Sequence, residues 1–487
     1  MIQQTEVLVI GSGFGAAAPA LRLAERGVPV LMIEKGNHII PARDFRQTSD
    51  PQYLTNYLKT CSGDNVSFIF AEGYGGGSGF YEMVSLRAPA AAFEQHDESG
   101  ARLWPKSLCR SALDPYYERA EAMLNVAQIA PEDVPKTGRV FSMMMRNLGY
   151  SCDRARYALR NCRGSGYCIS GCIFGAKQSL HINYLPQSEN MGMTVICNTE
   201  AMTVRPADGG YEVFCRDTLT DSEFVVKCRL LILAGGTVGT AALLLRSRKY
   251  LPAVSNQAGK NICSNGGVKA TGLLPDILPE VDIYRGRSHA GMVSYEFWKS
   301  HRITIAAVNP QPLALFSAAR FYRDGDMPAT RGWGENGVEL ARQMRRRLMA
   351  LYALGLTPPV AELRLENSRP SPMLQATEML YRYKTEVKSL LDDILTRNGC
   401  APVHIEYLDS TGQPVSGYHI DTTHMTGSCR MADSPERGVT DANGEVFGYR
   451  NLFISDGAAV PSSLGVNVSL TILANAERIA DGIVNRL

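Results

Sequence analysis

Short apolar runs alternate with glycine-rich or amphipathic stretches in the N-terminal part of the chain. Residues 6–10 (EVLVI) are apolar and rich in branched side chains, which is typical of a parallel strand buried on both faces. Residues 21–27 (LRLAERG) predict a helix that ends at Gly27, and residues 28–34 (VPVLMIE) predict a second strand that ends at Glu34. This order of strand, helix and strand predicts an α/β fold.

The same apolar pattern returns far along the chain. Residues 229–236 (RLLILAGG) and 452–457 (LFISDG) predict two further buried strands that end on glycines. Residues 238–247 (VGTAALLLRS) predict a helix, and residues 194–204 (TVICNTEAMTV) predict one more strand. The predicted sheet therefore takes strands from both ends of the chain.

The pattern changes between residues 264 and 415. Three stretches rich in β-branched and aromatic residues predict strands: 280–286 (EVDIYRG), 290–298 (AGMVSYEFW) and 302–308 (RITIAAV). Residues 338–354 predict one amphipathic helix. We interpret its basic face as solvated rather than as a surface for a membrane or a partner. That face carries Arg342, Arg345, Arg346 and Arg347.

Glycines follow the first predicted strand at once. Gly11 permits a tight turn, and Gly13 lets the backbone approach a pyrophosphate at the start of the following helix. Ala16 occupies the third position of this fingerprint. Glu34 lies about twenty residues further on, where a carboxylate accepts hydrogen bonds from ribose hydroxyls. The pattern predicts a dinucleotide-binding site.

A proline interrupts the helix that follows these glycines. Pro19 falls in the first turns, and a proline has no N–H to donate to the helix. Pro19 therefore costs little stability only if it occupies a position whose N–H would be unpaired in any case.

Composition and charge narrow the class of protein. The chain has 487 residues, of which 45% are hydrophobic, so it is long enough for two domains or for one domain with a large insertion. Lysine and arginine total 50 against 48 acidic residues, which gives no electrostatic reason to expect nucleic acid or an anionic membrane as partner. We expect a small-molecule partner.

The sequence also indicates a compartment. The first residues, MIQQTE, lack the basic start of a secretory signal, and no apolar run approaches the roughly 20 residues of a transmembrane segment. The cysteines are scattered through predicted strands, as at Cys197, Cys215 and Cys228, which favours buried thiols over disulfide bonds. We therefore predict a cytoplasmic protein.

Four further stretches carry a resemblance to a known family. Together with the N-terminal fingerprint, they are similar to the glucose-methanol-choline (GMC) family of FAD-dependent oxidoreductases, and most similar to its cholesterol oxidase branch. The stretches are EGYGGGSGFYEMVSLRAP with LDPYYERAEAMLNV from Glu72, CRGSGYCISGCIFGAKQSLHINYLP from Cys162, RLLILAGGTVGTAALLLRSR from Arg229, and the segment from His424 (HMTGSCRM) to DGAAVPSSLGVNVSLTILANAERIA.

The resemblance implies an α/β fold with two domains and FAD as cofactor. A Rossmann-like FAD-binding domain, with a doubly wound and mainly parallel sheet, would comprise residues 1–263 and 416–487, with cap segments within residues 40–165. An α+β substrate-binding domain, built on an antiparallel sheet, would comprise residues 264–415. The cofactor-binding residues that the resemblance implies are Gly11, Gly13, Phe14, Gly15, Ala16, Glu34, Gly75, Gly76, Gly77, Ser78, Tyr81, Ala201, Gly235, Asp456, Gly457 and Val468.

Some of these residues have specific implied roles. The backbone near Ala201 would contact the adenine, and the backbone of Val468 would lie at the pyrimidine edge of the flavin. Asp456 would bond the ribityl or pyrophosphate region, although an Asp after a strand also serves as a helix N-cap.

The resemblance also implies a chemistry. Alcohol oxidation by a flavin needs a base for the hydroxyl proton and transfer of the carbinol hydride to flavin N5. His424 matches the family's catalytic histidine, so we expect it to be the base. Asn467 stands where the cholesterol oxidase branch has an asparagine, so we expect it to hold and orient the substrate oxygen.

One position departs from cholesterol oxidases. Those enzymes carry a glutamate in the substrate domain that helps to move a steroid double bond, whereas the stretch ITIAAVNPQP offers apolar residues and Asn309. We do not expect steroid isomerisation, and the sequence leaves the substrate open.

Three cysteines with the spacing CxxxxxCxxxC raise an alternative. Cys162, Cys168 and Cys172 are similar in spacing to the cluster-binding cysteines of bacterial FAD-dependent glucose dehydrogenases, so an iron–sulfur cluster that passes electrons to a partner is one alternative. Zinc is disfavoured, because a structural site normally has four ligands and His181 is displaced along the chain. We favour free thiols without a metal, which leaves oxygen as a plausible electron acceptor.

Three functions remain open on the sequence alone. The first is oxidation of a primary or secondary CH–OH group of a medium-sized metabolite, with oxygen or an unidentified acceptor. The second is a lyase or isomerase of GMC descent that retains FAD. The third is a non-catalytic flavin subunit, against which the pair of His424 and Asn467 argues, since an electron carrier needs no base.

Overall fold

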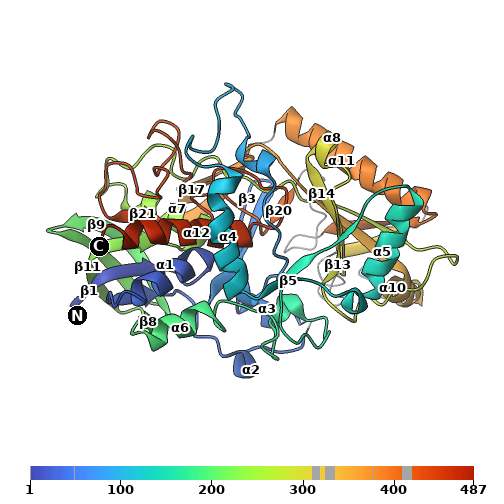
Figure 1. Ribbon diagram of the computed structural model, residues 1–487, viewed down its shortest axis with the longest axis horizontal. Helices are drawn as coiled ribbons and strands as arrows, with labels where there is room; N and C mark the ends of the chain where they lie inside the picture. Colours follow the sequence, from blue (N-terminus) through green and yellow to red (C-terminus); the bar gives the residue numbers. More distant parts are fainter. Residues whose placement is uncertain (1, 49, 310–318, 324–334, 376, 408–418) are drawn as a thin grey trace.

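In the part of the chain that the structure describes, two seven-stranded sheets organise the fold (Figure 1). The computed structural model describes residues 2–48, 50–309, 319–323, 335–375, 377–407 and 419–487. The sheet that contains the N-terminal strand lies at left in Figure 1, and the second sheet lies at right. One continuous apolar core extends through both parts.

The N-terminal sheet is mainly parallel, which confirms the predicted fold class. Its parallel strands, in spatial order, are β8 (Thr194–Ile196), β2 (Val30–Ile33), β1 (Ile2–Ile10), β11 (Glu223–Leu233) and β21 (Leu452–Ile454). Beside the first half of β11 lie two antiparallel strands, β10 (Gly210–Asp217) and β9 (Thr199–Ala207). Val7, Leu8 and Val9 of β1 are fully buried, because this strand is covered on both faces.

One strand prediction in this sheet is wrong. Residues 194–204 form two strands instead of one, because the chain turns at Cys197 and Asn198, and Asn198 adopts a positive φ of 53°. β8 pairs with β2, whereas β9 pairs with β10. Asparagine tolerates the left-handed region, so a turn is possible without a glycine.

Helices cover this sheet. α1 (Phe14–Ala24) packs against α12 (Ser469–Val484) and α6 (Tyr184–Asn190), and α12 also packs against α4 (Arg110–Met123). α7 (Gly236–Ser247) packs on β9. Figure 1 shows α1, α12 and α4 side by side, so the two ends of the chain meet in one layer.

Pro19 does not lie where its N–H would be unpaired. It is the sixth residue of α1, where an ordinary residue would donate to the carbonyl of Gly15. The buried hydroxyl of Ser455 donates to that carbonyl instead, at 2.7 Å. Pro19 therefore does not meet the condition under which a proline costs little, and a residue from the other end of the chain replaces the missing donor.

The second sheet is antiparallel. Its strands, in spatial order, are β15 (Ala319–Arg323), β19 (Ala401–Tyr407), β12 (Val268–Leu273), β16 (Leu348–Gly355), β14 (Ile303–Val308), β13 (His289–Ser294) and β6 (Asp153–Arg154). The helices beside it are α5 (Lys136–Asn147), α8 (Trp298–His301), α10 (Glu335–Arg347) and α11 (Glu378–Arg397). β13 and β14 confirm two of the three strands predicted here.

The helix predicted over residues 338–354 is half wrong. α10 ends at Arg347, and β16 begins at Leu348 and lies between β12 and β14. The sequence LMALYALG is apolar at nearly every position, so its periodicity could not distinguish a helix from a buried strand.

The strand predicted over residues 280–286 is also wrong. The N–H groups of Leu274, Val281 and Ile283 donate to the carbonyls of Arg347, Arg346 and Arg345, the last residues of α10. These residues therefore satisfy the free carbonyls at the end of a helix and join no sheet. The arginine side chains pair with nearby carboxylates, which agrees with a solvated face; the pairs are Arg342–Glu339, Arg345–Asp282, Arg346–Glu280 and Arg347–Asp276.

Smaller elements connect the two sheets. The small sheets comprise β3 (Leu58–Gly63), β4 (Val66–Ala71) and β20 (Ile420–Thr422); β17 (Ala361–Glu366) and β18 (Arg369–Leu374); and β5 (Val126–Gln128) and β7 (Arg156–Ala158). The short helices are α2 (Pro41–Asp44) and α3 (Pro51–Thr55), with 3-10 turns at Gly76–Gly79, Ala90–Phe93, Pro131–Asp133 and Cys168–Ser170.

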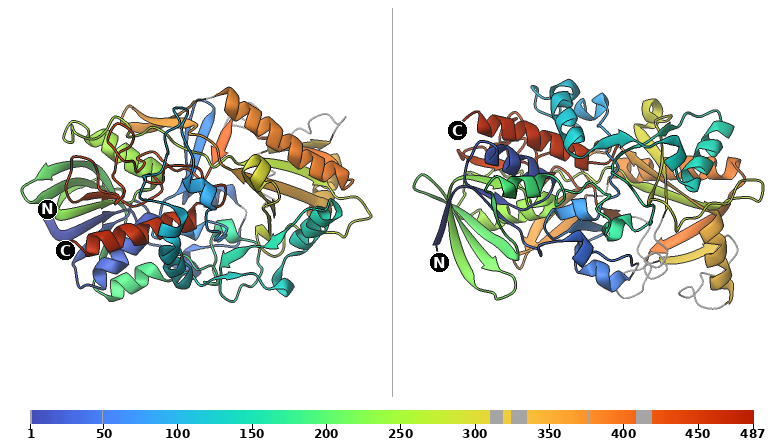
Figure 2. Two further views of the ribbon diagram at one scale, coloured as in Figure 1. Left: turned by 45° about the horizontal axis from the view of Figure 1, so that its top comes forward. Right: turned by 60° about the horizontal axis from the view of Figure 1, so that its bottom comes forward.

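The predicted domain limits at residues 263/264 and 415/416 stay a prediction. Two features bear on them: β6 joins the second sheet from within residues 40–165, and β17 packs against α7 of the first part. Figure 2 shows the two parts in close contact from two further sides. Across the described ranges, no helix is both long and apolar enough to cross a membrane.

Candidate active site

The turn between β1 and α1 is held by close backbone contacts at two glycines and is open at a third. A Cβ on Gly11, whose φ is 98°, would collide with the carbonyl of Ala234. A Cβ on Gly15 would lie 2.5 Å from the Cα of Asp456. A Cβ on Gly13 would meet no atom within 4 Å, so the backbone there borders open space at the start of a helix.

Glu34 connects this turn to the glycine-rich loop. Its buried carboxylate accepts from the hydroxyl of Ser12 at 2.6 Å and from the N–H groups of Gly36 at 2.9 Å and Gly73 at 3.2 Å. The Ser12 oxygen in turn accepts from the N–H of Gly75 at 2.9 Å. Burial raises the pKa of Glu34, while these donors oppose the rise.

The loop over residues 73–79 lies directly on the turn. A Cβ on Gly76 would approach the Cα of Gly13 to 3.0 Å, and Gly77 is exposed with no atom within 4 Å of its Cβ position. The buried hydroxyl of Ser78 fixes the loop by donating to the carbonyl of Gly75 at 2.6 Å. The structure therefore brings the two predicted glycine segments together around a common opening.

The aromatic neighbours of this opening also come from both segments. The rings of Phe14 and Tyr81 meet edge to face, with centroids 5.3 Å apart. Ala201 is buried in β9, and the backbone of Gly235 is exposed at the end of β11. Ala16 is fully buried in α1, so its small side chain serves helix packing.

Asp456 is engaged with the start of α7. Its buried carboxylate accepts from the N–H of Gly236 at 2.7 Å, the hydroxyl of Thr240 at 2.6 Å and the N–H of Ala458 at 2.8 Å. Burial raises its pKa to about 6. Asp456, which comes from another segment, therefore accepts from the first residue of α7, and β21 ends two residues earlier, at Ile454. Gly457 follows, and a Cβ there would lie 3.0 Å from the Thr237 hydroxyl.

His424 is positioned by backbone pairing between two C-terminal segments. The N–H groups of Gly427, Cys429 and Met431 donate to the carbonyls of Gly457, Ala458 and Ala459 at 2.9 to 3.0 Å. The hydroxyl of Thr237 donates to the carbonyl of Met425 at 2.7 Å, which fixes the residue after His424.

The imidazole of His424 is available as a base. The ring is half-buried, and none of the described residues is hydrogen-bonded to it. Burial lowers its pKa to about 4, because the charged form is poorly solvated there. At neutral pH the ring is therefore uncharged and able to accept a proton.

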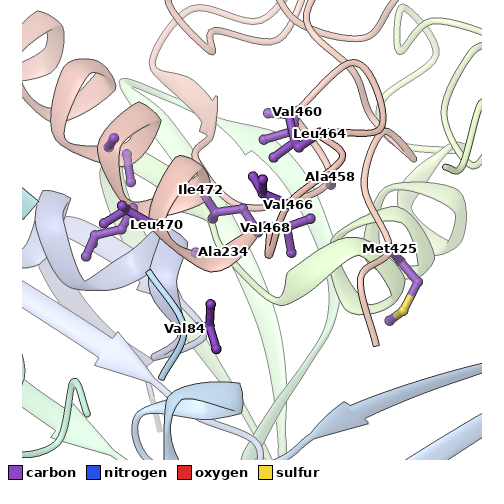
Figure 3. Packing of buried hydrophobic residues seen from close by; sticks show 14 of the residues in the cluster. Val84, Ala234, Met425, Ala458, Val460, Leu464, Val466, Val468, Leu470 and Ile472 are labelled. Carbon is purple, nitrogen blue, oxygen red and sulfur yellow. The ribbon is translucent and has the colours of Figure 1, made fainter. Parts of the chain in front are cut away.

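Asn467 lies in the loop that leads into α12. The side chain is half-buried, and Val468 directly precedes the helix, where free N–H groups are concentrated. Figure 3 shows this start of α12 from close by, with Leu464 and Val466 on the preceding loop and Met425 on a neighbouring segment.

No sequence pattern indicated the residue that holds this loop. The fully buried side chain of Asn265 donates to the carbonyl of Val466 at 2.7 Å and accepts from the N–H groups of Leu464 and Gly465, each at 2.8 Å. The hydroxyl of Thr304 in β14 donates to the carbonyl of Gly465 at 2.6 Å. Asn265 lies in SNGG, which resembles an ordinary turn, so its role depends on contacts about 200 positions away.

The three cysteines of the CxxxxxCxxxC motif are free thiols. The Cys162 sulfur accepts from the N–H of Gly164 at 3.4 Å, and burial raises the pKa of the Cys168 thiol. Over the described ranges, no three His, Cys, Asp or Glu residues form a group that could hold a metal ion. Among the scattered cysteines, Cys215 and Cys228 are buried and Cys197 is half-buried.

The opening fits a dinucleotide. Unobstructed glycine backbone at Gly13 and Gly77 faces it, the start of α1 supplies N–H groups, and Glu34 stands at the end of β2.

Comparisons with known proteins agree with this fit. A family model described as GMC oxidoreductase matches residues 7–263 with its N-terminal part and residues 394–476 with its C-terminal part. The chain is 27% identical to a cholesterol oxidase of Mycobacterium tuberculosis, over 98% of this chain and 90% of the relative. It is 25% identical to the paromamine 6'-oxidase of Streptomyces fradiae, over 99% of this chain and 92% of the relative.

A solved structure supports the fold. The pyridoxine 4-oxidase from Mesorbium loti superposes with a TM-score of 0.69 at 16% identity, covering 99% of both chains.

Proposed function

Since the chain belongs to the GMC oxidoreductase family, we propose that it oxidises an alcohol with His424 as the base and Asn467 as the hydroxyl-binding group. The family membership makes the protein an FAD-dependent enzyme of the alcohol oxidase or dehydrogenase type that acts on CH–OH donors. The observation that carries the proposed mechanism is the uncharged, half-buried imidazole of His424, which lacks a hydrogen-bond partner among the described residues.

FAD would be held by the residues around the opening. The backbone of Gly11, Gly13 and Gly15 and the start of α1 would receive its phosphates, and Glu34 would accept from a ribose hydroxyl that shares the carboxylate with Ser12. The rest of the site would be formed by the loop Gly75–Ser78 with Tyr81, by the backbone at Gly235 and Gly457, by Asp456, and by the N-terminal end of α12 at Val468. When bound, FAD supplies the acceptor for the hydride that leaves the carbinol carbon.

The protein's own part is proton removal and orientation. The uncharged His424 accepts the hydroxyl proton of the substrate, which allows the carbinol oxygen to become a carbonyl. The side-chain amide of Asn467 donates a hydrogen bond to the same oxygen, and it cannot act as an acid or a base because an amide does not titrate. Asn265 acts through Asn467, because it fixes the loop that carries this residue.

The substrate is proposed to be a medium-sized metabolite that carries a primary or secondary alcohol. The printed names of the two relatives differ in substrate, since one is a cholesterol oxidase and the other a paromamine oxidase. The electron acceptor is oxygen or another acceptor, and the cytoplasmic location stays part of the proposal. No observation favours the lyase, the isomerase or the electron-transfer alternative.

Replacement of the imidazole tests the mechanism. We expect His424→Ala to retain FAD and to slow anaerobic flavin reduction by an alcohol by about 10²- to 10⁴-fold, because a positioned base contributes that much. Stopped-flow absorbance of the bound flavin measures this rate, and His404→Ala, a change in the second sheet, serves as the control. A rate close to wild type in His424→Ala would remove this residue from the mechanism.

The pH dependence gives an independent check. Since burial lowers the pKa of His424 to about 4, the ring stays uncharged through neutrality, and protonation at lower pH abolishes its function as a base. The wild-type rate of flavin reduction should therefore be flat between about pH 5 and 8 and should fall only at lower pH. A fall centred near the ordinary histidine pKa of about 6.5 would contradict this assignment.

A further inference from the structure

A buried lysine lies against the glycine-rich loop. Lys177 is 1% exposed, and its ammonium donates to the backbone carbonyls of Gly79 at 2.6 Å, Tyr81 at 3.1 Å and Cys168 at 2.6 Å. These bonds use all three donors of an ammonium group. The nitrogen also lies 5.6 Å from the centre of the Tyr81 ring. Lys177 therefore joins the glycine-rich loop to the loop that carries the three cysteines.

The backbone of Lys177 is fixed by pairing with neighbouring segments. Lys177 forms a bridge with Leu159, which directly follows β7, and Tyr157 of β7 forms a bridge with Val84. Val84 lies three residues after the end of the contacts that the ammonium makes with the glycine-rich loop. The position of the lysine is therefore set by backbone pairing as well as by the bonds of its ammonium.

The charge of this lysine requires an explanation. Lysine is rarely fully buried, because an ammonium loses the solvation of water. Burial lowers the pKa of Lys177 to about 8, so the ammonium is still mostly charged at pH 7. A neutral group holds the same loop nearby, since the hydroxyl of Ser179 donates to the carbonyl of Ser78 at 2.7 Å. Fixing the loop does not by itself need a charge.

Hydrogen bonds lead from this charge to the opening assigned to FAD. The carbonyl of Gly79 and the N–H of Phe80 belong to one peptide group and point in opposite directions, because the peptide is trans. The N–H of Phe80 donates to the carbonyl of Gly77 at 3.1 Å. Gly77 is exposed and borders the opening, with no atom within 4 Å of its Cβ position. A cation at one end of such a chain polarises the bonds along it.

We propose that Lys177 is a positioning residue for the cofactor, which fixes the backbone of Gly77 against FAD and raises the reduction potential of the bound flavin. A flavin that accepts a hydride gains a negative charge, and a fixed cation nearby favours that form. Lys177 acts through the loop and not by contact with the substrate. The inference rests on the proposed place of FAD beside this loop and does not depend on the role of His424.

The reduction potential tests the inference. Lys177→Met keeps the approximate length of the side chain and removes the charge. At a fixed potential we expect the ratio of reduced to oxidised flavin to fall about tenfold, which corresponds to about 30 mV for a two-electron couple. Spectroelectrochemical titration of the folded, FAD-loaded protein measures this ratio. The dissociation constant of FAD, measured by flavin fluorescence, should rise by about tenfold.

Two matched controls isolate the charge. Ser179→Ala removes a neutral hydrogen bond to the same loop, so it should weaken FAD binding and leave the potential unchanged. Lys249 is exposed and its ammonium lies 4.6 Å from the ring of Tyr250, so Lys249→Met removes a similar pair elsewhere and should behave like wild type. An unchanged potential in Lys177→Met, or an equal fall in Ser179→Ala, would overturn the inference.

Two further measurements apply even if Lys177→Met does not fold. Lys177→Arg keeps the charge and should keep the wild-type potential, so a fall as large as that expected for Lys177→Met would contradict the inference. In the wild-type holoenzyme, the amide of Phe80 should exchange its hydrogen slowly, because the clamped loop rarely opens. Rapid exchange of this amide would show that the loop is not clamped and would refute the role of Lys177.

Gly77→Ala separates this inference from the proposed cofactor site. The added Cβ would meet no protein atom within 4 Å, so the protein should fold, but it would enter the space assigned to FAD and weaken FAD binding. If Gly77→Ala binds FAD like wild type, the proposed site is wrong and the inference falls with it. If Gly77→Ala loses FAD affinity while Lys177→Met keeps the wild-type potential, the cofactor site stands and the role of Lys177 is refuted.

Discussion

The cofactor side and the substrate side of this molecule are assembled in different ways. The glycine turn after β1 and Glu34 at the end of β2 lie within one strand–helix–strand unit whose spacing is visible in the sequence, although Ala234 and Asp456 pack against the turn. The Asn467 loop instead depends on Asn265 and Thr304, which come from far earlier in the chain. A local unit can be recognised from its spacing, whereas a site built from distant segments cannot.

The contrast has a physical origin. Phosphate binding needs free N–H groups at a helix start and a backbone without side chains, and both are properties of a short sequence. Holding an amide against a substrate needs several fixed partners, because an exposed loop of this kind has many conformations. The partners of the Asn467 loop are Asn265, which precedes β12, and Thr304 in β14.

The largest effect is expected from glycines within the local unit. Gly11→Ala places a Cβ against the carbonyl of Ala234 and requires a positive φ, so we expect a loss of about 2–5 kcal/mol in the free energy of unfolding. Thermal unfolding of the holoenzyme measures this loss.

Gly13→Ala is the matched variant within the same turn. Its Cβ meets no protein atom within 4 Å and its φ is −77°, so the protein should fold normally. Because the Cβ would enter the space assigned to FAD, this variant should retain less FAD after purification. If Gly13→Ala retains the wild-type amount of FAD, the cofactor does not occupy that opening.

A somewhat smaller effect is expected where the distant segments meet. Asn265→Ala leaves two N–H groups and one carbonyl of residues 464–466 without their buried partner, which should lower the free energy of unfolding by about 2–4 kcal/mol. Flavin reduction should fall by about tenfold, because Asn467 would lose its fixed position.

Asn265→Asp distinguishes an effect on the position of Asn467 from an effect on the free energy of unfolding. It keeps the two accepted hydrogen bonds and loses the donated one, so it should recover part of the reduction rate. We would measure both variants by stopped flow below their unfolding temperatures. If the reduction rate of folded Asn265→Ala equals that of wild type, Asn265 is not a positioning residue.

The smallest effect is expected where Ser455, from the C-terminal end of the chain, contacts α1. Ser455→Ala leaves the carbonyl of Gly15 without a donor, because Pro19 has no N–H, and should cost about 1–2 kcal/mol of stability. In the Pro19→Ala background the new N–H can donate to Gly15, so the same serine change should cost less. A double-mutant cycle in chemical denaturation measures this coupling, and additive effects would contradict it.

Sequence patterns were most reliable for the short apolar runs of the parallel sheet. The apolar runs that became β1, β2, β11 and β21 were recognised because parallel strands covered on both faces require them. Residues 338–354 were misassigned because LMALYALG suits a buried helix and a buried strand equally. Residues 280–286 have the composition of a strand, but they satisfy the carbonyls at the end of α10.

The sequence by itself determined the parallel sheet, the glycine turn proposed to bind FAD and the identity of the two residues proposed for catalysis, since each follows from local spacing or from the family resemblance. Only the tertiary structure decided that Ser455 replaces the donor that Pro19 lacks and that Asn265 holds the Asn467 loop. These contacts join residues far apart in the chain, and their pairing is set by the packing of two sheets and not by any local preference.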